Sequence, residues 1–311
     1  MICANPYIRG GIAYGCGQCL PCSINRKRTW THRLILERTQ HSDAAFVTLT
    51  YRSTELPVVD TPDGTGSSAT LVPEHVRNWL KRLRFAIAPT RIRFFLVGEY
   101  GDTTQRPHYH AILFGYPSCQ RGRTRHIKGD NVFDCCPHCN LLWETWTHGG
   151  IDVGDVTDES IQYCCGYVTK KMTERGHPNL NGRHPEFARM SNRPGIGKMA
   201  MHDVASALLS LNLENAQPDV PSALRHGNRL LPLGRYLRRY LRTLVGKDEK
   251  ISQEAFDEVQ KKMSSLYTDL VYDSINSKGE KSVKQGFVDH NKGKIRNMTA
   301  RQKLFKKRNA L

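Results

Sequence analysis

Two histidines lie two residues apart in the stretch RPHYHAILFG, which spans residues 106–115. The stretch is mostly apolar and predicts a β-strand, in which side chains two residues apart project from the same face. His108 and His110 therefore present two imidazoles side by side, and Tyr109 between them faces the other way. Because ring nitrogens buried without partners are costly, the pair indicates a binding site rather than two isolated core histidines.

An acidic residue ends the apolar stretch that comes just before the histidines. Glu99 is the ninth residue of RIRFFLVGEY, residues 91–100, and the turn-forming GDTTQRP follows it. A hairpin would place Glu99 beside the histidine pair on the neighbouring strand. Two neutral imidazoles and one carboxylate, with open positions left, favour a divalent cation such as Mg²⁺ or Mn²⁺. Such an ion polarises a phosphoryl oxygen.

Two tyrosines lie four residues apart in DESIQYCCGYVTKKM, residues 158–172, which predicts a helix. This spacing puts the phenols of Tyr163 and Tyr167 on one helical face, about 6 Å apart. A phenol with a pKa of about 10 is a poor nucleophile, but a bound phosphate with Lys170 and Lys171 nearby would favour the phenolate. The product would be a phosphotyrosine ester that conserves the phosphodiester bond energy. Two core aromatics are the alternative.

The ten cysteines do not resemble a disulfide ladder. In a reducing compartment, closely spaced cysteines are first candidates for thiolate ligands. The motif CGQCLPC supplies Cys16, Cys19 and Cys22, which need a fourth ligand. The motif CCPHC could provide it through Cys136, Cys139 or His138 and so complete a structural zinc site. The alternative is a set of reduced cysteines around a loop.

The elements that must position these residues form an α+β pattern. We expect strands at 46–51, 91–100, 107–115 and 151–156, and helices at 23–40, 73–87, 158–172, 200–213, 235–244 and 252–275. We expect an exposed loop at 52–73, irregular structure at 116–150 and a weakly structured basic tail after 276. This order predicts an antiparallel sheet with flanking helices. We divide the chain into a cysteine-rich segment 1–40, a domain 41–215 and a helical, basic region 216–311.

The formal net charge of +17 indicates a polyanionic partner, most often nucleic acid. Candidate DNA contacts are Arg106, Lys171, Arg193 and Lys198. The helix at 235–244 and the tail are candidate phosphate contacts too, with an ordinary solvated face as the alternative. The sequence RPGIGK, residues 193–198, lacks the spacing of a Walker loop. Unwinding of a duplex would therefore come from a partner protein.

Targeting signals are missing from the sequence as given. No run of about 18 apolar residues predicts a transmembrane helix, and residues 1–11 show no basic start followed by an apolar stretch. We therefore expect no membrane partner and a cytoplasmic location.

The combination of FVTLTY, HYH on a strand and a Y-x-x-x-Y-x-x-K helix resembles the HUH endonucleases that initiate rolling-circle replication. The sequences GEYGDTTQRPHYHAILFG and RPGIGK closely resemble the replication initiators of gokushoviruses, a branch of the small single-stranded DNA phages (Microviridae). The resemblance covers about residues 15–200. It implies a five-stranded antiparallel sheet with packed helices, and an aromatic residue stands here at the middle of HYH where the family has an aliphatic one.

The resemblance also implies roles for residues in this sequence. His108 and His110 match the metal-binding pair, Glu99 the acidic ligand, Tyr163 and Tyr167 the nucleophiles, and Lys170 the motif lysine. The implied activity is nicking and rejoining of origin DNA in rolling-circle replication, with a host helicase and DNA polymerase as partners in a bacterial cell. The alternatives are a plasmid or transposon nickase of the same superfamily and a non-catalytic, zinc-stabilised regulator that binds nucleic acid.

Overall fold

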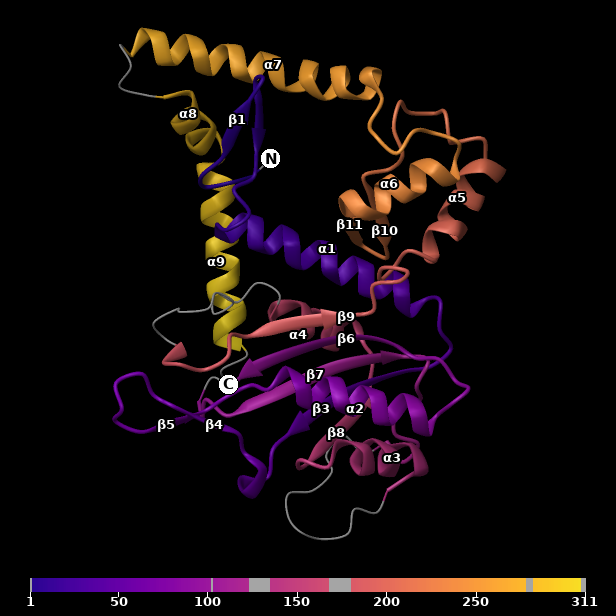
Figure 1. The fold of residues 1–311 in the computed structure, drawn as a ribbon. Helices are drawn as coiled ribbons and strands as arrows, with labels where there is room; N and C mark the ends of the chain where they lie inside the picture. The colour runs from indigo at the N-terminus through magenta and orange to yellow at the C-terminus, as the bar shows by residue number, and fades with distance from the viewer. Residues whose placement is uncertain (1, 102, 123–134, 168–179, 278–281, 309–311) are drawn as a thin grey trace. The chain divides into compact units, whose positions relative to one another are not determined.

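The computed structural model describes residues 2–101, 103–122, 135–167, 180–277 and 282–308 (Figure 1). The chain divides into two compact units, one formed by residues 30–200 and the other by residues 1–29 together with 201–311. Helix α1 (Leu20–Arg38) begins in one unit and ends in the other. The three segments proposed from the sequence, 1–40, 41–215 and 216–311, remain a prediction.

A five-stranded antiparallel sheet forms the centre of the unit 30–200 and confirms the α+β fold class. Its order is β8-β3-β7-β6-β9. The strands are β3 (Ala44–Thr50), β6 (Arg93–Tyr100), β7 (Pro107–Phe114), β8 (Ile151–Asp155) and β9 (Phe187–Met190). The sequence predicted the first four. It missed β9, a four-residue edge strand that pairs only with β6 and has too short a pattern to predict by itself.

The two faces of this sheet carry separate hydrophobic clusters because side chains alternate along each strand. Tyr109, Ala111 and Leu113 of β7 pack on the face covered by α2 (Pro73–Ala86) and α3 (Pro137–Trp146). Ile112 and Phe114 lie on the opposite face, with residues of α1 and α4 (Asp158–Tyr167). His108 and His110 share the parity of Ile112, so the histidines project from the face on which α4 packs.

Helix α4 starts directly after the edge strand β8, and its first turn is well capped. The backbone N–H of Thr157 donates to Ser160 Oγ at 2.9 Å, and that of Ser160 to Thr157 Oγ1 at 3.3 Å. Asp158 and Glu159 lie in the first turn, where the helix dipole favours negative charge. Ile161, Cys164 and Cys165 then face the sheet, which fixes the rotation of the helix and so the direction of Tyr163.

Two segments of the unit 30–200 correct the sequence prediction. Residues 52–73, expected to be a loop, contain the short helix η1 (Ser53–Glu55) and a hairpin of β4 (Val58–Asp60) with β5 (Ser67–Ala69). Residues 116–150, expected to be irregular, contain α3, which begins at Pro137 and ends before Thr147 in the left-handed region. Its apolar residues Leu142 and Trp146 are buried in the core, and the cysteines around them hid this pattern.

The other unit combines two small hairpins with helices. They are β1 (Tyr7–Arg9), β2 (Ile12–Tyr14), β10 (Ala223–His226), β11 (Arg229–Pro232), α5 (Ala200–Ser210), α6 (Gly234–Leu244), α7 (Gln253–Asn276), α8 (Val283–His290) and α9 (Lys292–Arg308). The prediction of a weakly structured tail is wrong, since α8 and α9 occupy most of it. Ser282 caps α8 by accepting from the backbone N–H of Gln285. Among the described residues, no helix is long and apolar enough to cross a membrane.

Candidate metal and nucleophile centre

Glu99, His108 and His110 meet on two neighbouring strands of the sheet. Glu99 of β6 stands directly opposite His108 of β7 in the antiparallel register. Its Oε1 lies 2.8 Å from His108 Nε2 and 2.9 Å from His110 Nε2. Glu99 is 2% exposed and His110 5%, while the His108 side chain is 20% exposed. One carboxylate oxygen and two imidazole nitrogens therefore converge at the edge of the buried region.

These three atoms fit one face of an octahedral ion. Ligands about 2.1 Å from such an ion, at right angles to one another, lie about 3.0 Å apart, close to the two distances from Glu99 Oε1. Three protein ligands leave open positions for water or phosphate oxygens, which is the arrangement of an exchangeable catalytic ion. The donor set of the Glu99, His108 and His110 side chains is thus compatible with a divalent cation.

The outer nitrogens of both imidazoles have oxygen partners that orient the rings. His110 Nδ1 lies 2.9 Å from Thr48 Oγ1, and His108 Nδ1 lies 3.1 Å from the carbonyl oxygen of Arg106. When each Nδ1–H donates to its oxygen, each Nε2 keeps its lone pair for a cation. The sequence analysis missed Thr48. The signal was present in FVTLTY, because Thr48 stands opposite His110 in the register of β3 and β7.

Tyr163 lies against this group, from α4 on the same face of the sheet. Its ring makes an edge-on contact with the His110 ring, with centroids 5.0 Å apart and planes at 85°. Phe46 of β3 stacks on His110 at 5.7 Å and meets Tyr163 edge-on at 6.4 Å. Tyr163 is 47% exposed. The phenol is therefore next to the candidate ion and still accessible to a large substrate.

The other predicted residues of this helix are less completely described. The backbone of Tyr167 lies in α4, one helical turn after Tyr163. Lys170 and Lys171 lie outside the described residues. The roles assigned to Tyr163, Tyr167 and Lys170 therefore remain predictions.

Two neighbouring groups are unsuited to nucleophilic attack. Tyr109 points to the opposite face of the sheet, as its place between the histidines predicted, and its hydroxyl lies 2.8 Å from that of Tyr51. Burial raises the pKa of Tyr109 to about 12. Burial, with the charges of Cys165 and Glu99, also raises the pKa of Cys164 well above its usual value. Both groups therefore stay protonated near neutral pH.

The cysteines form two separate groups of four, which corrects the expectation of one shared zinc site. Cys16, Cys19 and Cys22 gather with Cys3, and Cys136 and Cys139 gather with Cys119 and Cys135. The first group belongs to the unit with the N-terminus, the second to the unit with the sheet. His138 is not a member of either group, since its Nε2 lies 3.2 Å from Gln120 Nε2. The sequence analysis missed Cys3, Cys119 and Cys135.

The predicted DNA contacts have different surroundings. The guanidinium of Arg106 donates to the carbonyl oxygen of Tyr51 at 3.0 Å. The segment RPGIGK forms a turn against α1, in which Arg33 Nε donates to the Ile196 carbonyl at 2.9 Å. Gly197 has a positive φ of +79°, and a Cβ there would lie 2.9 Å from the Arg33 carbonyl oxygen. The segment therefore has a structural role; Arg193 at its start is exposed, and Lys198 at its end is half-buried.

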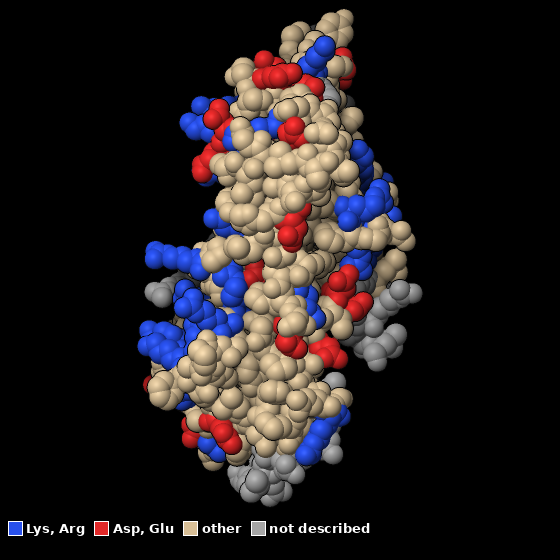
Figure 2. Space-filling model, turned by 90° about the vertical axis from the view of Figure 1, so that its right-hand side faces the viewer, with Lys and Arg blue, Asp and Glu red and all other residues tan. Residues whose placement is uncertain are grey.

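The positive charge is distributed over the surface. Figure 2 shows several groups of Lys and Arg side chains on one face, with Asp and Glu between them. With a net charge of +17, such a surface attracts a long polyanion through several separate contacts.

Comparison with known proteins defines the class to which this centre belongs. The family model for Replication-associated protein ORF2 matches residues 44–172, which run from the start of β3 past the end of α4. Glu99, His108, His110 and Tyr163 all lie within the match. This region is thus a member of the replication-associated protein ORF2 family.

Three curated phage proteins are similar to the chain over longer stretches. Replication-associated protein VP4 of Bdellovibrio phage phiMH2K is 29% identical over 192 residues, 60% of this chain and 56% of the relative. Replication-associated protein ORF4 of Chlamydia phage 1 is 26% identical over 81% of this chain and 59% of the relative. For ORF2 of Spiroplasma virus 4 the figures are 26%, 83% and 80%. All three are Microviridae proteins, so the expected resemblance is confirmed.

The chain spans less than two thirds of the length of the first two relatives. No solved structure matches it.

Proposed function

We propose that the protein is a metal-dependent, site-specific nickase and strand transferase for single-stranded DNA. It would initiate and terminate rolling-circle replication of a single-stranded DNA phage. The observation that carries the proposal is the contact between the Tyr163 ring and His110, one of three side chains that converge as ligands for one cation. The names of the phage relatives support a role in replication.

The chemistry is a transesterification. A divalent cation held by Glu99, His108 and His110 supplies positive charge to a phosphoryl oxygen. Tyr163 Oη gives up its proton and forms a bond to phosphorus, while the bond from phosphorus to the 3′ oxygen breaks and that oxygen takes up a proton. The 5′ phosphate remains on the tyrosine and the free 3′ hydroxyl can be extended. Lys170 and Lys171 would stabilise the anionic groups.

Termination needs a second nucleophile. Tyr167 repeats the transfer at the regenerated origin, and the released 3′ hydroxyl attacks the first phosphotyrosine to close a circle. Either tyrosine can act first. In this proposal, basic side chains including Arg106, Arg193 and Lys198 hold the DNA backbone. A host helicase and polymerase would supply unwinding and synthesis in the cytoplasm of a bacterial cell.

The test is the formation of a covalent adduct. The protein is incubated with Mn²⁺ and the labelled circular single-stranded DNA that encodes it, and the products are separated on a denaturing gel. The wild type should give a protein-linked fragment. Tyr163→Phe combined with Tyr167→Phe should give none while still retarding the DNA on a native gel. Tyr272→Phe, which alters an exposed tyrosine of α7 in the other unit, should react like the wild type.

Adducts that persist in the double variant would refute the nucleophile assignment. The cysteine groups favour one competing function, a zinc-stabilised regulator that binds nucleic acid without cleaving it. That protein would bind DNA and give no adduct with Mn²⁺ even in the wild type.

A further inference from the structure

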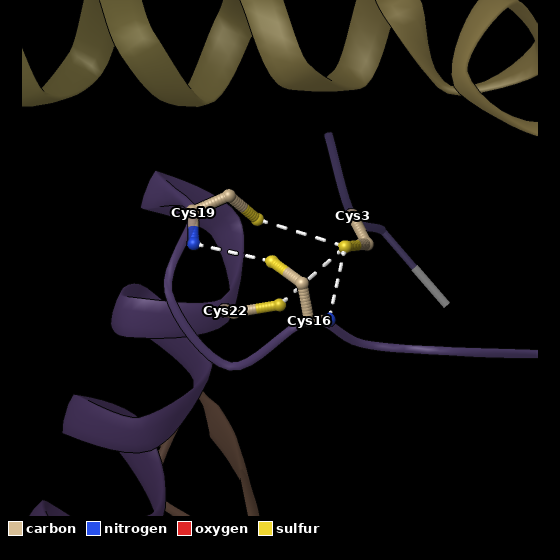
Figure 3. Close-up of side chains that lie close together, drawn as sticks. All are labelled: Cys3, Cys16, Cys19 and Cys22. Carbon is tan, nitrogen blue, oxygen red and sulfur yellow. Dashed lines mark hydrogen bonds between the residues drawn. The ribbon is translucent and has the colours of Figure 1, made fainter. Parts of the chain in front are cut away.

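The four cysteines nearest the N-terminus converge from separate parts of the fold (Figure 3). Cys3 precedes the hairpin of β1 and β2, Cys16 and Cys19 follow it, and Cys22 lies in the first turn of α1. Each strand of that hairpin has only three residues. A two-stranded hairpin of this size is marginal in water, so a cross-link between its two ends and the helix would stabilise it.

The distances between the sulfurs fit a tetrahedral metal site. Cys3 Sγ lies 3.7 Å from Cys19 Sγ and 3.7 Å from Cys22 Sγ. Four sulfurs about 2.3 Å from a central Zn²⁺ lie about 3.8 Å from one another, whereas a disulfide needs about 2.05 Å. All four sulfurs lie within 4.8 Å of one another. The separation is thus that of ligands around a common ion.

Backbone N–H groups point at these sulfurs, as they do where thiolates must be stabilised. Cys3 Sγ accepts from the N–H groups of Asn5 and Cys16, both at 3.3 Å. Cys16 Sγ accepts from Cys19 at 3.3 Å, and Cys19 Sγ from Ala4 at 3.4 Å. Hydrogen bonds to a sulfur favour its charged form and orient it as a ligand. The loop that directs them turns at Gly17, which has φ of +78°.

The second group repeats this construction in the unit with the sheet. Cys119 Sγ lies 3.6 Å from Cys135 Sγ. Cys136 is the residue before α3, and Cys139 lies in its first turn. The Cys135 N–H donates to Asn140 Oδ1 at 3.0 Å, which holds the approach to the helix. Here too, two ligands at the start of a helix meet two from a loop, and the four sulfurs lie within 4.8 Å of one another.

We propose that each group of four cysteines binds one Zn²⁺ as a closed, structural tetrathiolate, giving two zinc ions per chain. Four thiols lose four protons as four Zn–S bonds form, and no oxidant is needed. Because all four positions of each ion are filled by protein, these ions have no open site for a substrate. The proposal is independent of the nicking reaction, whose ion is held by Glu99, His108 and His110.

The test is the metal content of the full-length protein, purified in the presence of a reductant and measured by mass spectrometry of its metals. The wild type should contain two zinc ions per chain. Cys3→Ser and Cys139→Ser should each contain one, and the double variant none. Cys165→Ala is the matched control, since Cys165 is buried under α4 and belongs to neither group. It should keep both ions.

A second measurement protects the result against variants that fail to fold. The wild type grown with Co²⁺ should show the thiolate-to-cobalt absorption of a tetrahedral tetrathiolate, with an intensity for two ions that falls by half in each single variant. Iron in place of zinc, disulfides in the reduced wild type, or a zinc content unchanged by Cys3→Ser and Cys139→Ser would overturn the proposal. One zinc ion in the wild type would also overturn it for the group whose variant keeps that ion.

Discussion

Two buried glutamates of the unit 30–200 have different partners. Glu37 of α1 is 1% exposed and Glu99 of β6 is 2% exposed. Glu37 forms an ion pair with Arg93 and accepts from the Gly197 backbone N–H at 2.6 Å. Glu99 lies between two imidazoles, those of His108 and His110. Arginine carries a permanent charge, whereas imidazole is mostly neutral near pH 7.

The difference separates a structural carboxylate from one suited to hold a cation. Burial alone would raise the pKa of Glu37, but the hydrogen bonds from His41, Gly197 and Arg93 outweigh burial and lower it. Its charge is thus already neutralised within the fold. Glu99 and its two imidazoles add one negative charge to a buried place, and a divalent cation would stabilise it there. Burial of an acid is common to both; the kind of partner distinguishes them.

The largest effect is expected from Glu99→Gln. The amide keeps the shape of the side chain but removes its charge, so the site should bind a cation weakly and lose several kcal/mol of transition-state stabilisation. At 1.36 kcal/mol per factor of ten, nicking should slow by about 1,000-fold. The measurement is the rate of adduct formation in Mn²⁺, with the urea midpoint of unfolding as the control. A rate within threefold of the wild type would remove Glu99 from the site.

Glu37→Gln should have the opposite pattern. Arg93 would lose its anionic partner in a mostly buried place, and we expect a loss of about 2–4 kcal/mol in the free energy of unfolding. The rate of adduct formation per folded molecule should stay close to that of the wild type. Urea unfolding followed by circular dichroism measures the first quantity. If Glu37→Gln instead slows the reaction and leaves stability unchanged, the assignment of the two glutamates is reversed.

The pH dependence of stability sharpens the same test. The pKa of Glu37 is lower in the folded state than its usual value, so its contribution to stability is present above the unfolded pKa of about 4.3. It is lost as the pH falls through the lower folded pKa. Between pH 5.5 and pH 3.5, the wild type should therefore lose more stability than Glu37→Gln. Parallel losses in the two proteins would contradict this.

The parts of the site that the sequence predicts depend on short-range geometry. The two-residue period of a strand puts His108 and His110 on one face, and a hairpin brings Glu99 beside them. Each contact involves residues close in the chain, so the pattern is visible without the fold. The contact of Tyr163 with His110 needed the resemblance as well, because nothing local says on which face α4 packs.

The missed residues depend on how distant segments meet. Cys3 joins the cysteines of α1 only because a short hairpin returns the chain to them. Cys119 and Cys135 lie either side of a long excursion. Thr48 becomes the partner of His110 because β3, far earlier in the chain, pairs with β7. Propensity and spacing carry no information about these pairings, which follow from the packing of the whole unit.

The smallest effect is expected from Thr48→Val, which tests how the charge-free side of the site is organised. Valine keeps the shape and β-branching of threonine but removes the hydroxyl that meets His110 Nδ1 at 2.9 Å. Loss of such a partner weakens metal binding by about 10- to 100-fold. Adduct formation should therefore need more Mn²⁺ and recover when the ion saturates.

The matched control for this variant is Thr50→Val. Thr50 lies on the same face of β3, and its hydroxyl donates to the carbonyl oxygen of Gly150 at 3.1 Å rather than to an imidazole. Its Mn²⁺ dependence should be that of the wild type. An equal shift in both variants would mean that the strand, and not the hydrogen bond to His110, sets the affinity. A shift confined to Thr48→Val would identify Thr48 as a positioning residue for an imidazole that binds the ion.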